Sequence, residues 1–291
     1  MTVSARVYTD PACSASWASE PKFRKLLVDF GAEVQFSYVM GGLARDYTAG
    51  YEDAESGIGG QRGVFYGLLL HWLERADSSG MPIDPRLWSE GPITTTYPAC
   101  MAVKAAAEQG PEAEARYLRT LREGLLCFRR KLDTTEALVE EARRAGLDVQ
   151  RFRVDLGSHA IVEAFGADLE ATRTIPSEAR EAGGAKPGQD EERLVFPSVH
   201  FEGERGERWV FGIHSYDAYR DAAIAAGAEP ARGELPDVAT ALARFGRMAT
   251  VEVEAVCDLR GPTAAAELWR LAAEWRVRPI RVLTGWLWEP A

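Results

Sequence analysis

The N-terminal segment carries the pattern that constrains the fold most. Residues 5–9 read as a short strand that stops at the turn pair Asp10-Pro11, and a helical pattern follows over residues 14–30. Residues 34–40 alternate with period two and end at a glycine pair, which predicts a second strand. A strand, a helix and a strand of these lengths form a βαβ unit, whose crossover is expected to be right-handed.

A long helical block interrupts this α/β pattern. Apolar periodicity predicts helices within residues 60–178, two of them with N-caps at Thr134 or Thr135 and at Asp148. Strand patterns return at 194–201 and 208–212, which predict a β-hairpin followed by a helix over 215–226. The polar, glycine-rich stretch 177–192 is expected to be a surface loop.

The chain beyond residue 228 is predicted to be a separate, α-rich part. Helices are expected over residues 238–245, 250–257 and 262–275, and an extended run over 279–288 follows them. Three short helices and a terminal ribbon predict a small winged-helix-like appendage. Its basic residues are interleaved with acidic ones, so it offers no basic patch for DNA.

Charge and cysteine usage exclude several classes of protein. Among 291 residues, 34 basic and 44 acidic side chains give a net charge of −10, which argues against nucleic-acid and membrane partners. The four cysteines and four histidines lack metal-ligand spacing, so neither a metal site nor a disulfide framework is expected. Targeting signals and long apolar stretches are not found, so a cytoplasmic location is expected.

Cys13 is the most informative residue, because it opens the first predicted helix directly after the first strand. Helix N-termini stabilise negative charge, and a cysteine there can have a pKa lowered from about 8.5 to roughly 3.5–7.5. The sequence therefore favours a reactive thiolate at Cys13 over a buried structural cysteine. Cys100 opens another helix and is a remote candidate for a partner thiol, whereas Cys127 and Cys257 lie on apolar faces and are expected in the core.

The segment around Cys13 resembles the active-site segment of the DsbA family of thioredoxin-fold proteins. The run Thr9-Asp-Pro-Ala-Cys13-Ser-Ala-Ser16-Trp17-Ala-Ser-Glu-Pro21 is similar to the pattern D-P-x-C-x-x-C-W-x-x-E-P. Cytosolic members with this pattern include FrnE-type oxidoreductases and the adaptor proteins that present the Spx regulator to ClpXP. Residues 38–43 and 97–110 resemble further segments of the family, so the resemblance covers about residues 3–228.

The resemblance implies an α/β architecture, a thioredoxin fold with an inserted all-helical domain. Residues 1–58 and 180–228 would form the split thioredoxin domain, residues 59–179 the insertion and residues 229–291 the α-rich appendage. The family carries a cis-proline opposite the active-site thiol, and Pro197 matches that position.

The resemblance also implies a substrate site beside Cys13. Trp17, Phe196 and Pro197 are its expected substrate-binding residues. The backbone of Phe196 would pair with a bound peptide or with glutathione.

One departure from the family pattern limits the chemistry. Ser16 replaces the second cysteine, and serine cannot act as the thiolate that resolves a mixed disulfide. A monothiol thiol–disulfide oxidoreductase or isomerase remains open. In it Cys13 is the nucleophile, Ser16 orients the thiolate through its Oγ or its N–H, and an external thiol such as glutathione resolves the intermediate.

Two alternatives remain beside that function. One is a glutathione-dependent transferase or isomerase of the kappa type, and the other is a non-catalytic adaptor of the Spx-adaptor type. The expected partner is a protein or a small thiol or disulfide. No resident cofactor is expected, and glutathione would act as a co-substrate.

Overall fold

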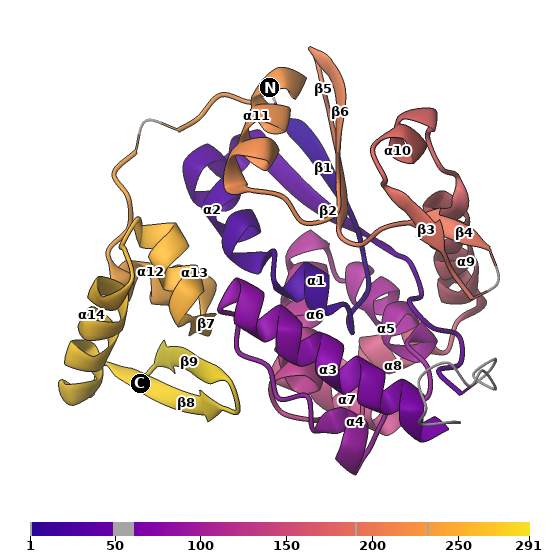
Figure 1. Cartoon of the computed structure of the whole chain (residues 1–291), viewed down its shortest axis with the longest axis horizontal. Helices are drawn as coiled ribbons and strands as arrows, with labels where there is room; N and C mark the ends of the chain where they lie inside the picture. Colours follow the sequence, from indigo (N-terminus) through magenta and orange to yellow (C-terminus); the bar gives the residue numbers. More distant parts are fainter. Residues whose placement is uncertain (1, 49–60, 190, 232) are drawn as a thin grey trace.

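The computed structural model has a four-stranded sheet at the centre of its N-terminal part (Figure 1). The described residues are 2–48, 61–189, 191–231 and 233–291. The strand order is β2-β1-β5-β6, with β1 parallel to β2 and antiparallel to β5. These strands are β1 (Val3–Thr9), β2 (Val34–Met40), β5 (Ser198–Gly203) and β6 (Gly206–Phe211). The predicted βαβ unit and β-hairpin therefore join in one mixed sheet.

The helix predicted over residues 14–30 is two helices, α1 (Ser14–Trp17) and α2 (Glu20–Phe30). The physical reason is Pro21, which lacks an N–H and whose ring would clash with the carbonyl of Trp17 in a continuous helix. A short 3₁₀ turn, η1 (Gly31–Glu33), leads from α2 into β2. Helices α2 and α11 (Tyr216–Ala226) share an apolar core with the sheet.

The predicted helical block is confirmed as an insertion between β2 and the second half of the sheet. Its helices are α3 (Gln61–Ser79), α4 (Leu87–Glu90), α5 (Tyr97–Ala107), α6 (Pro111–Leu126), α7 (Thr135–Arg144), α8 (Val149–Leu156) and α9 (His159–Arg173). Thr134 and Asp148 cap α7 and α8 as predicted. The expected boundary at residues 58 and 59 lies outside the described residues.

The stretch 177–192, expected to be a surface loop, contains regular structure instead. It forms α10 (Ser177–Glu181) and β3 (Ala185–Pro187), and it reaches the first residue of β4 (Glu192–Leu194). Strands β3 and β4 form a small antiparallel hairpin. The prediction of a loop was wrong because the fully buried side chains of Ala179 and Leu194 anchor this polar stretch in an apolar cluster.

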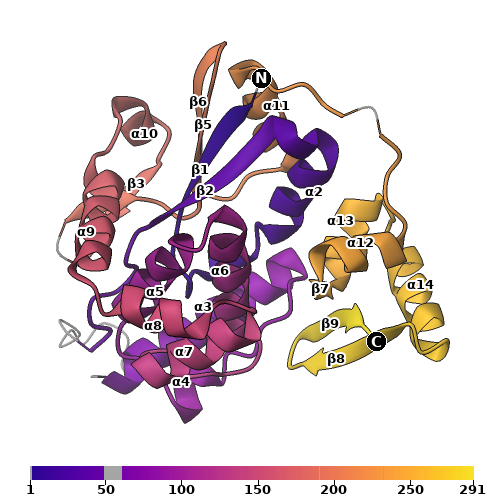
Figure 2. The same cartoon turned by 180° about the vertical axis from the view of Figure 1, so that it is seen from behind.

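The C-terminal part has its own core and packs beside α2 and the insertion (Figure 2). Its elements are α12 (Val238–Phe245), β7 (Met248–Ala249), α13 (Thr250–Cys257), α14 (Pro262–Ala273), β8 (Val277–Val282) and β9 (Gly285–Pro290). The predicted extended run is a hairpin of β8 and β9, which β7 extends in the order β7-β9-β8. The likeness to a winged helix stays a prediction.

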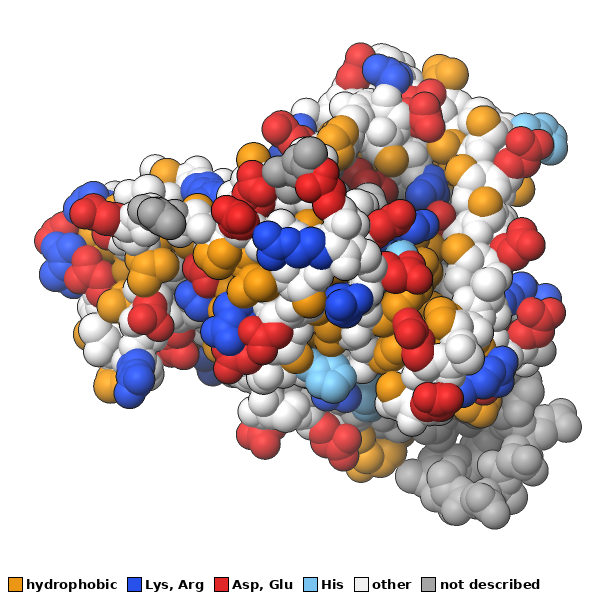
Figure 3. Space-filling view, turned by 90° about the horizontal axis from the view of Figure 1, so that it is seen from above, with side chains coloured by type: hydrophobic (Ala, Val, Ile, Leu, Met, Phe, Trp, Pro, Cys, Tyr) orange, Lys and Arg blue, Asp and Glu red, His pale blue; other side chains and the backbone are white. Residues whose placement is uncertain are grey.

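The surface seen from above mixes acidic and basic side chains, and the C-terminal part projects to one side (Figure 3). Among the described residues, no helix is long and apolar enough to cross a membrane. The same residues contain no group of three or more metal-ligating side chains arranged around a common point.

Candidate functional site

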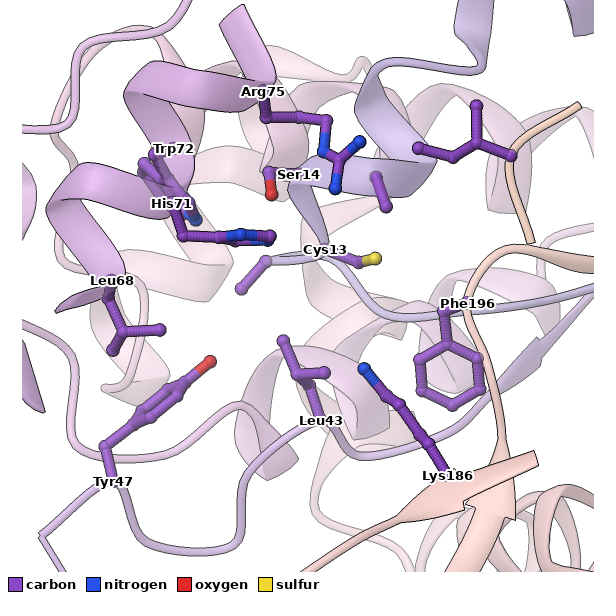
Figure 4. A pocket seen from close by; sticks show the side chains of 13 residues that line it. Cys13, Ser14, Leu43, Tyr47, Leu68, His71, Trp72, Arg75, Lys186 and Phe196 are labelled. Atoms are coloured by element: carbon purple, nitrogen blue, oxygen red, sulfur yellow. The ribbon is translucent and has the colours of Figure 1, made fainter. Parts of the chain in front are cut away.

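Cys13 lies at the N-cap of α1, on the wall of a cavity of about 370 Å³ (Figure 4). Its backbone N–H donates to the carbonyl of Asp10 at 3.1 Å, which closes the turn after β1. Its Sγ accepts a hydrogen bond from the backbone N–H of Ser16 at 3.4 Å. Cys13 is only 6% exposed, so a reagent reaches its sulfur through this cavity.

The segment across from Cys13 contains the cis peptide bond Phe196–Pro197, as the family resemblance implied. The Phe196 ring lines the cavity and lies over Gly41, where an added Cβ would be 1.9 Å from the ring. Within the described part of the chain, the Phe196 backbone N–H and C=O have no hydrogen-bond partner. They are therefore free to pair with an extended ligand, while the Pro197 carbonyl accepts from the Gly212 N–H at 2.7 Å.

Asp10 is a buried residue that holds the Cys13 turn in place. Its Oδ1 accepts from the Ala12 N–H at 2.8 Å, and its Oδ2 accepts from the Leu43 N–H at 2.6 Å. The Thr96 hydroxyl donates to the same Oδ2 at 2.7 Å. One carboxylate thus ties the turn to the segments after β2 and before α5. From the sequence, Asp10 was interpreted as part of a turn signal and of the family pattern, and its hydrogen bonds to Leu43 and Thr96 were not predicted.

Cys100 also contacts Asp10, but its environment opposes a thiolate. The Cys100 Sγ donates to Asp10 Oδ2 at 3.3 Å, and the residue is fully buried. Burial, and then the negative charge of Asp10, raise the pKa of the Cys100 thiol well above its usual range. The structure therefore gives Cys100 the properties of a protonated hydrogen-bond donor.

Ser16 presents its backbone to the Cys13 sulfur and turns its hydroxyl away. The Ser16 Oγ accepts from the Thr9 hydroxyl at 2.7 Å, and Thr9 Oγ1 accepts from Arg122 Nη2 at 2.6 Å. Of the two donors that the sequence left open for Ser16, the N–H is the one that reaches Cys13 Sγ. The Ser16 side chain instead connects α1 to α6 of the insertion.

Trp17 requires a correction, because it does not line the cavity where a substrate was expected to contact it. The side chain is fully buried, and its Nε1 donates to the carbonyl of Pro82 at 3.0 Å. The Arg119 guanidinium lies over the indole, 4.3 Å from the ring centroid. Trp17 points inward and fastens α1 to the insertion.

Three basic side chains border the cavity, and the sequence did not reveal them. His71 and Arg75 come from α3, while Lys186 reaches in from β3 on the opposite side (Figure 4). Residues 71 and 75 are four apart on a helix, but only the tertiary structure shows that this face meets Cys13. Lys186 lies in the stretch 177–192, which was expected to be a surface loop, so no sequence pattern indicated that it belongs to a site.

The charges around the cavity influence one another. Burial lowers the pKa of the Lys186 ammonium, and the nearby Arg193 and Arg75 lower it further, whereas Cys13 acts in the opposite direction. Burial likewise lowers the pKa of Arg193, whose guanidinium lies 4.2 Å from the centroid of the Phe196 ring. Burial and Arg75 lower the pKa of His71. A negative charge in the cavity would relieve this repulsion.

A buried set of ion pairs lies beneath α1. We call it the junction network, and it consists of Glu20, Arg24, Arg119, Arg122 and Glu252. Glu252 accepts two hydrogen bonds from Arg119, at 2.8 and 2.9 Å, and pairs with Arg24 at 3.1 Å. Glu20 pairs with both Arg119 and Arg122. The network joins α2, α6 and α13, and Arg122 extends it to Thr9.

The sheet, the helical insertion and a cysteine across from a cis-proline are together typical of a thioredoxin-fold protein. A family model described as thioredoxin matches residues 7–176, and the chain belongs to this family. It is similar to the ClpXP adapter protein SpxH of Halalkalibacterium halodurans, with 29% identity over 295 residues that cover 97% of this chain and 88% of the relative.

Solved structures share the fold. A Nitrosomonas europaea protein assigned to the protein disulfide isomerases matches with a TM-score of 0.59 and 17% identity, covering 76% of this chain and 96% of that chain. The cytosolic disulfide reductase DsbM of Pseudomonas aeruginosa matches with a TM-score of 0.52 and 15% identity, covering 76% and 93%. The DsbA-type thioredoxin fold that the resemblance implied is confirmed.

Proposed function

We propose that the chain catalyses thiol–disulfide exchange with Cys13 as its only reacting thiol. The observation that carries this proposal is the placement of Cys13 Sγ on the cavity wall, with the Ser16 N–H donating to it and the unpaired Phe196 backbone across from it. A hydrogen bond to sulfur stabilises a developing thiolate, and free backbone groups can align an extended disulfide substrate.

The exchange proceeds in two displacements. The Cys13 thiolate attacks one sulfur of a disulfide, which forms a mixed disulfide and releases the other sulfur as a thiolate with the electron pair of the broken bond. An external thiolate such as glutathione then attacks the substrate sulfur of the mixed disulfide, and Cys13 leaves as a thiolate. The electrons balance without a further oxidant, because one disulfide and one thiolate are consumed and one of each is formed.

The other cysteines support a monothiol pathway. Burial raises the pKa of the Cys127 thiol well above its usual range, and Glu123 adds to this shift. Burial also raises the pKa of Cys257 to about 11. With Cys100 protonated against Asp10, an external thiol is the simplest resolving group.

A coupled assay tests this function. The rate of glutathione-dependent reduction of a small disulfide is measured for the wild type, Cys13→Ser and Cys257→Ala. We expect Cys13→Ser to fall to the uncatalysed rate and Cys257→Ala to keep the wild-type rate. Catalysis by Cys13→Ser at the wild-type rate would remove the basis of the proposal.

A second candidate function is that of an adaptor that delivers a client protein to ClpXP. Its support is the similarity to the ClpXP adapter protein SpxH along nearly the whole chain. Its test is the rate at which ClpXP degrades an Spx-type regulator with the wild type or with Cys13→Ser present. Equal acceleration by both proteins would favour the adaptor, and an effect that depends on Cys13 would favour thiol chemistry.

The kappa-type alternative would use a serine near the start of this helix. It gains no support from the geometry, because the Ser16 hydroxyl is fully buried and bonded to Thr9. Both remaining candidates act in a reducing compartment, so the cytoplasm is the proposed location. The name of the cytosolic reductase DsbM agrees with this placement.

A further inference from the structure

The cavity beside Cys13 contains positive charge that no described residue neutralises. The side chains of Arg75 and Lys186 form no ion pair or hydrogen bond with the described part of the chain, and the buried Arg75 Nε has no partner there. None of the described side chains that line the cavity is acidic. This is unusual in a chain of net charge −10, where many arginines pair with a carboxylate.

The directions of these side chains make the charge available to a ligand. Arg75 and His71 point into the cavity from α3, and Lys186 points into it from β3, so the three groups face one another across the space next to Cys13 (Figure 4). A guanidinium binds a carboxylate with two parallel hydrogen bonds, and an ammonium binds one as a point charge. The cavity thus offers two separated positions for carboxylate groups.

The size of the cavity restricts the ligand further. A volume of about 370 Å³ lies at the lower end of the range for small-molecule sites, roughly 300–1,000 Å³. A space of this size holds one small thiol moiety.

We propose that this cavity binds the carboxylate groups of a small anionic disulfide, with Arg75 and Lys186 as the binding residues and His71 as an additional hydrogen-bond donor. Glutathione disulfide belongs to this chemical class. The inference rests on the proposed thiol–disulfide function and specifies its substrate. The same residues hold the bound half in the mixed disulfide while the second half leaves as a thiolate.

Two disulfide probes of different charge test this inference. 5,5′-Dithiobis(2-nitrobenzoate) carries two carboxylates, and 4,4′-dithiodipyridine is uncharged at neutral pH. The rate constant for reaction at Cys13 is measured with each probe for the wild type, Arg75→Gln, Lys186→Gln and the double variant, after subtraction of the Cys13→Ser background. Arg153→Gln on α8 is the matched control, because this exposed arginine lies outside the cavity.

We expect the ratio of anionic-probe rate to neutral-probe rate to fall by roughly tenfold or more in the double variant, the size expected for one lost charge-assisted hydrogen bond. Added salt should lower the same ratio in the wild type, since partly exposed charges are screened. The control should keep the wild-type ratio.

An unchanged ratio in the double variant, with Cys13 still reactive, would overturn the anionic-substrate inference and leave the proposed function standing. Absence of reaction at Cys13 with both probes in the wild type would overturn the proposed function, and with it the inference. The two failures are therefore distinguishable.

Discussion

Cys13 owes its position to neighbouring polar groups more than to α1, which is a single turn of four residues. A helix this short has a small macrodipole and adds little to the stabilisation of a thiolate. The group that acts directly on the sulfur is the Ser16 N–H, which donates a hydrogen bond to it. Asp10 fixes the turn on one side through Ala12 and Leu43, and Thr9 fixes Ser16 on the other. The geometry of the thiol therefore depends on Thr9, Asp10 and Ser16, which do not themselves line the cavity.

A first prediction at this scale concerns Gly41. In Gly41→Ala the added Cβ would meet the Phe196 ring, which must move together with the segment that contains the cis bond. Overpacking of this kind costs about 1–3 kcal/mol of unfolding free energy, and disulfide exchange at Cys13 should slow. Denaturant unfolding and probe kinetics measure the two effects.

The matched control is Gly166→Ala in α9, where an added Cβ meets no described atom within 4 Å. It should be neutral or stabilising by up to about 1 kcal/mol, because alanine favours helix. Equal behaviour of the two variants would contradict the contact between Gly41 and Phe196.

A second prediction concerns Glu114 in α6. The pKa of its carboxyl is raised from 4.5 to about 7, mainly by burial. The charge of Lys104 lowers this pKa, and the charge of Asp168 raises it. Because this pKa is higher in the folded state, the contribution of Glu114 to stability is greatest below pH 4.5 and is lost as the pH rises through 7. The full change is at most about 3 kcal/mol.

Glu114→Gln should therefore gain stability relative to the wild type at pH 8 and lose this advantage at pH 5. Urea unfolding at the two pH values measures the difference, and Glu112→Gln, an exposed neighbour on the same helix, is the control. A stability difference between wild type and Glu114→Gln that does not change with pH would contradict the assignment.

At the scale of elements, the junction network connects helices from three parts of the chain. Glu252 is fully buried, and its partners Arg24 and Arg119 are nearly so. Burial alone would raise the pKa of Glu252, but Arg119 and Arg24 outweigh burial and hold it below its usual value. The carboxylate is therefore charged at neutral pH, and both arginines share it as a counter-charge.

Glu252→Gln should lower the unfolding free energy by about 3–5 kcal/mol, because it removes the counter-charge that pairs with the buried Arg24 and one of the carboxylates that pair with Arg119. Glu267→Gln is the control, since it breaks an exposed pair with Arg270 and should cost about 1 kcal/mol or less. Similar losses in both variants, measured by denaturant unfolding, would contradict a structural role for the network.

The individual helices and strands differ in how well the sequence predicts them. Helices with clear periodicity and caps, such as those capped by Thr134 and Asp148, were predicted because their signals are local. The hairpin of β3 and β4 was missed, because the burial of Ala179 and Leu194 depends on distant contacts.

At the candidate site, a sequence motif allowed Cys13 and Pro197 to be named in advance, and the structure places Cys13 on the cavity wall and gives Pro197 a cis peptide bond. Arg75 and Lys186 were not, since only folding brings α3 and β3 to the same cavity. The indole of Trp17 was expected to line the substrate site and does not line the cavity, because sequence spacing does not show on which side of α1 the indole lies.

At the scale of the whole molecule, the C-terminal part shares a core with the insertion. Ala249, Val282 and Leu287 are buried in the same apolar cluster as the insertion residues. Thr284 also exchanges two hydrogen bonds with the backbone of Ile83, at 2.8 and 3.0 Å. The C-terminal part, which was predicted to be an appendage, thus packs against the insertion through a shared apolar cluster and two hydrogen bonds.

Calorimetry should therefore show one cooperative unfolding transition for the full chain. Thr284→Val, which removes both hydrogen bonds to Ile83, should lower the midpoint and keep the single transition. Two resolved transitions in the wild type would contradict a shared core.

The central claim, that Cys13 reacts without a second thiol of this chain, has one most direct test. The protein is treated with glutathione disulfide, quenched with acid and analysed by intact and peptide mass spectrometry, with Cys100→Ala in parallel. A mixed disulfide at Cys13 that forms at the same rate in both proteins is the expected result. An intramolecular disulfide between Cys13 and Cys100, or glutathione attached only elsewhere, would contradict the claim.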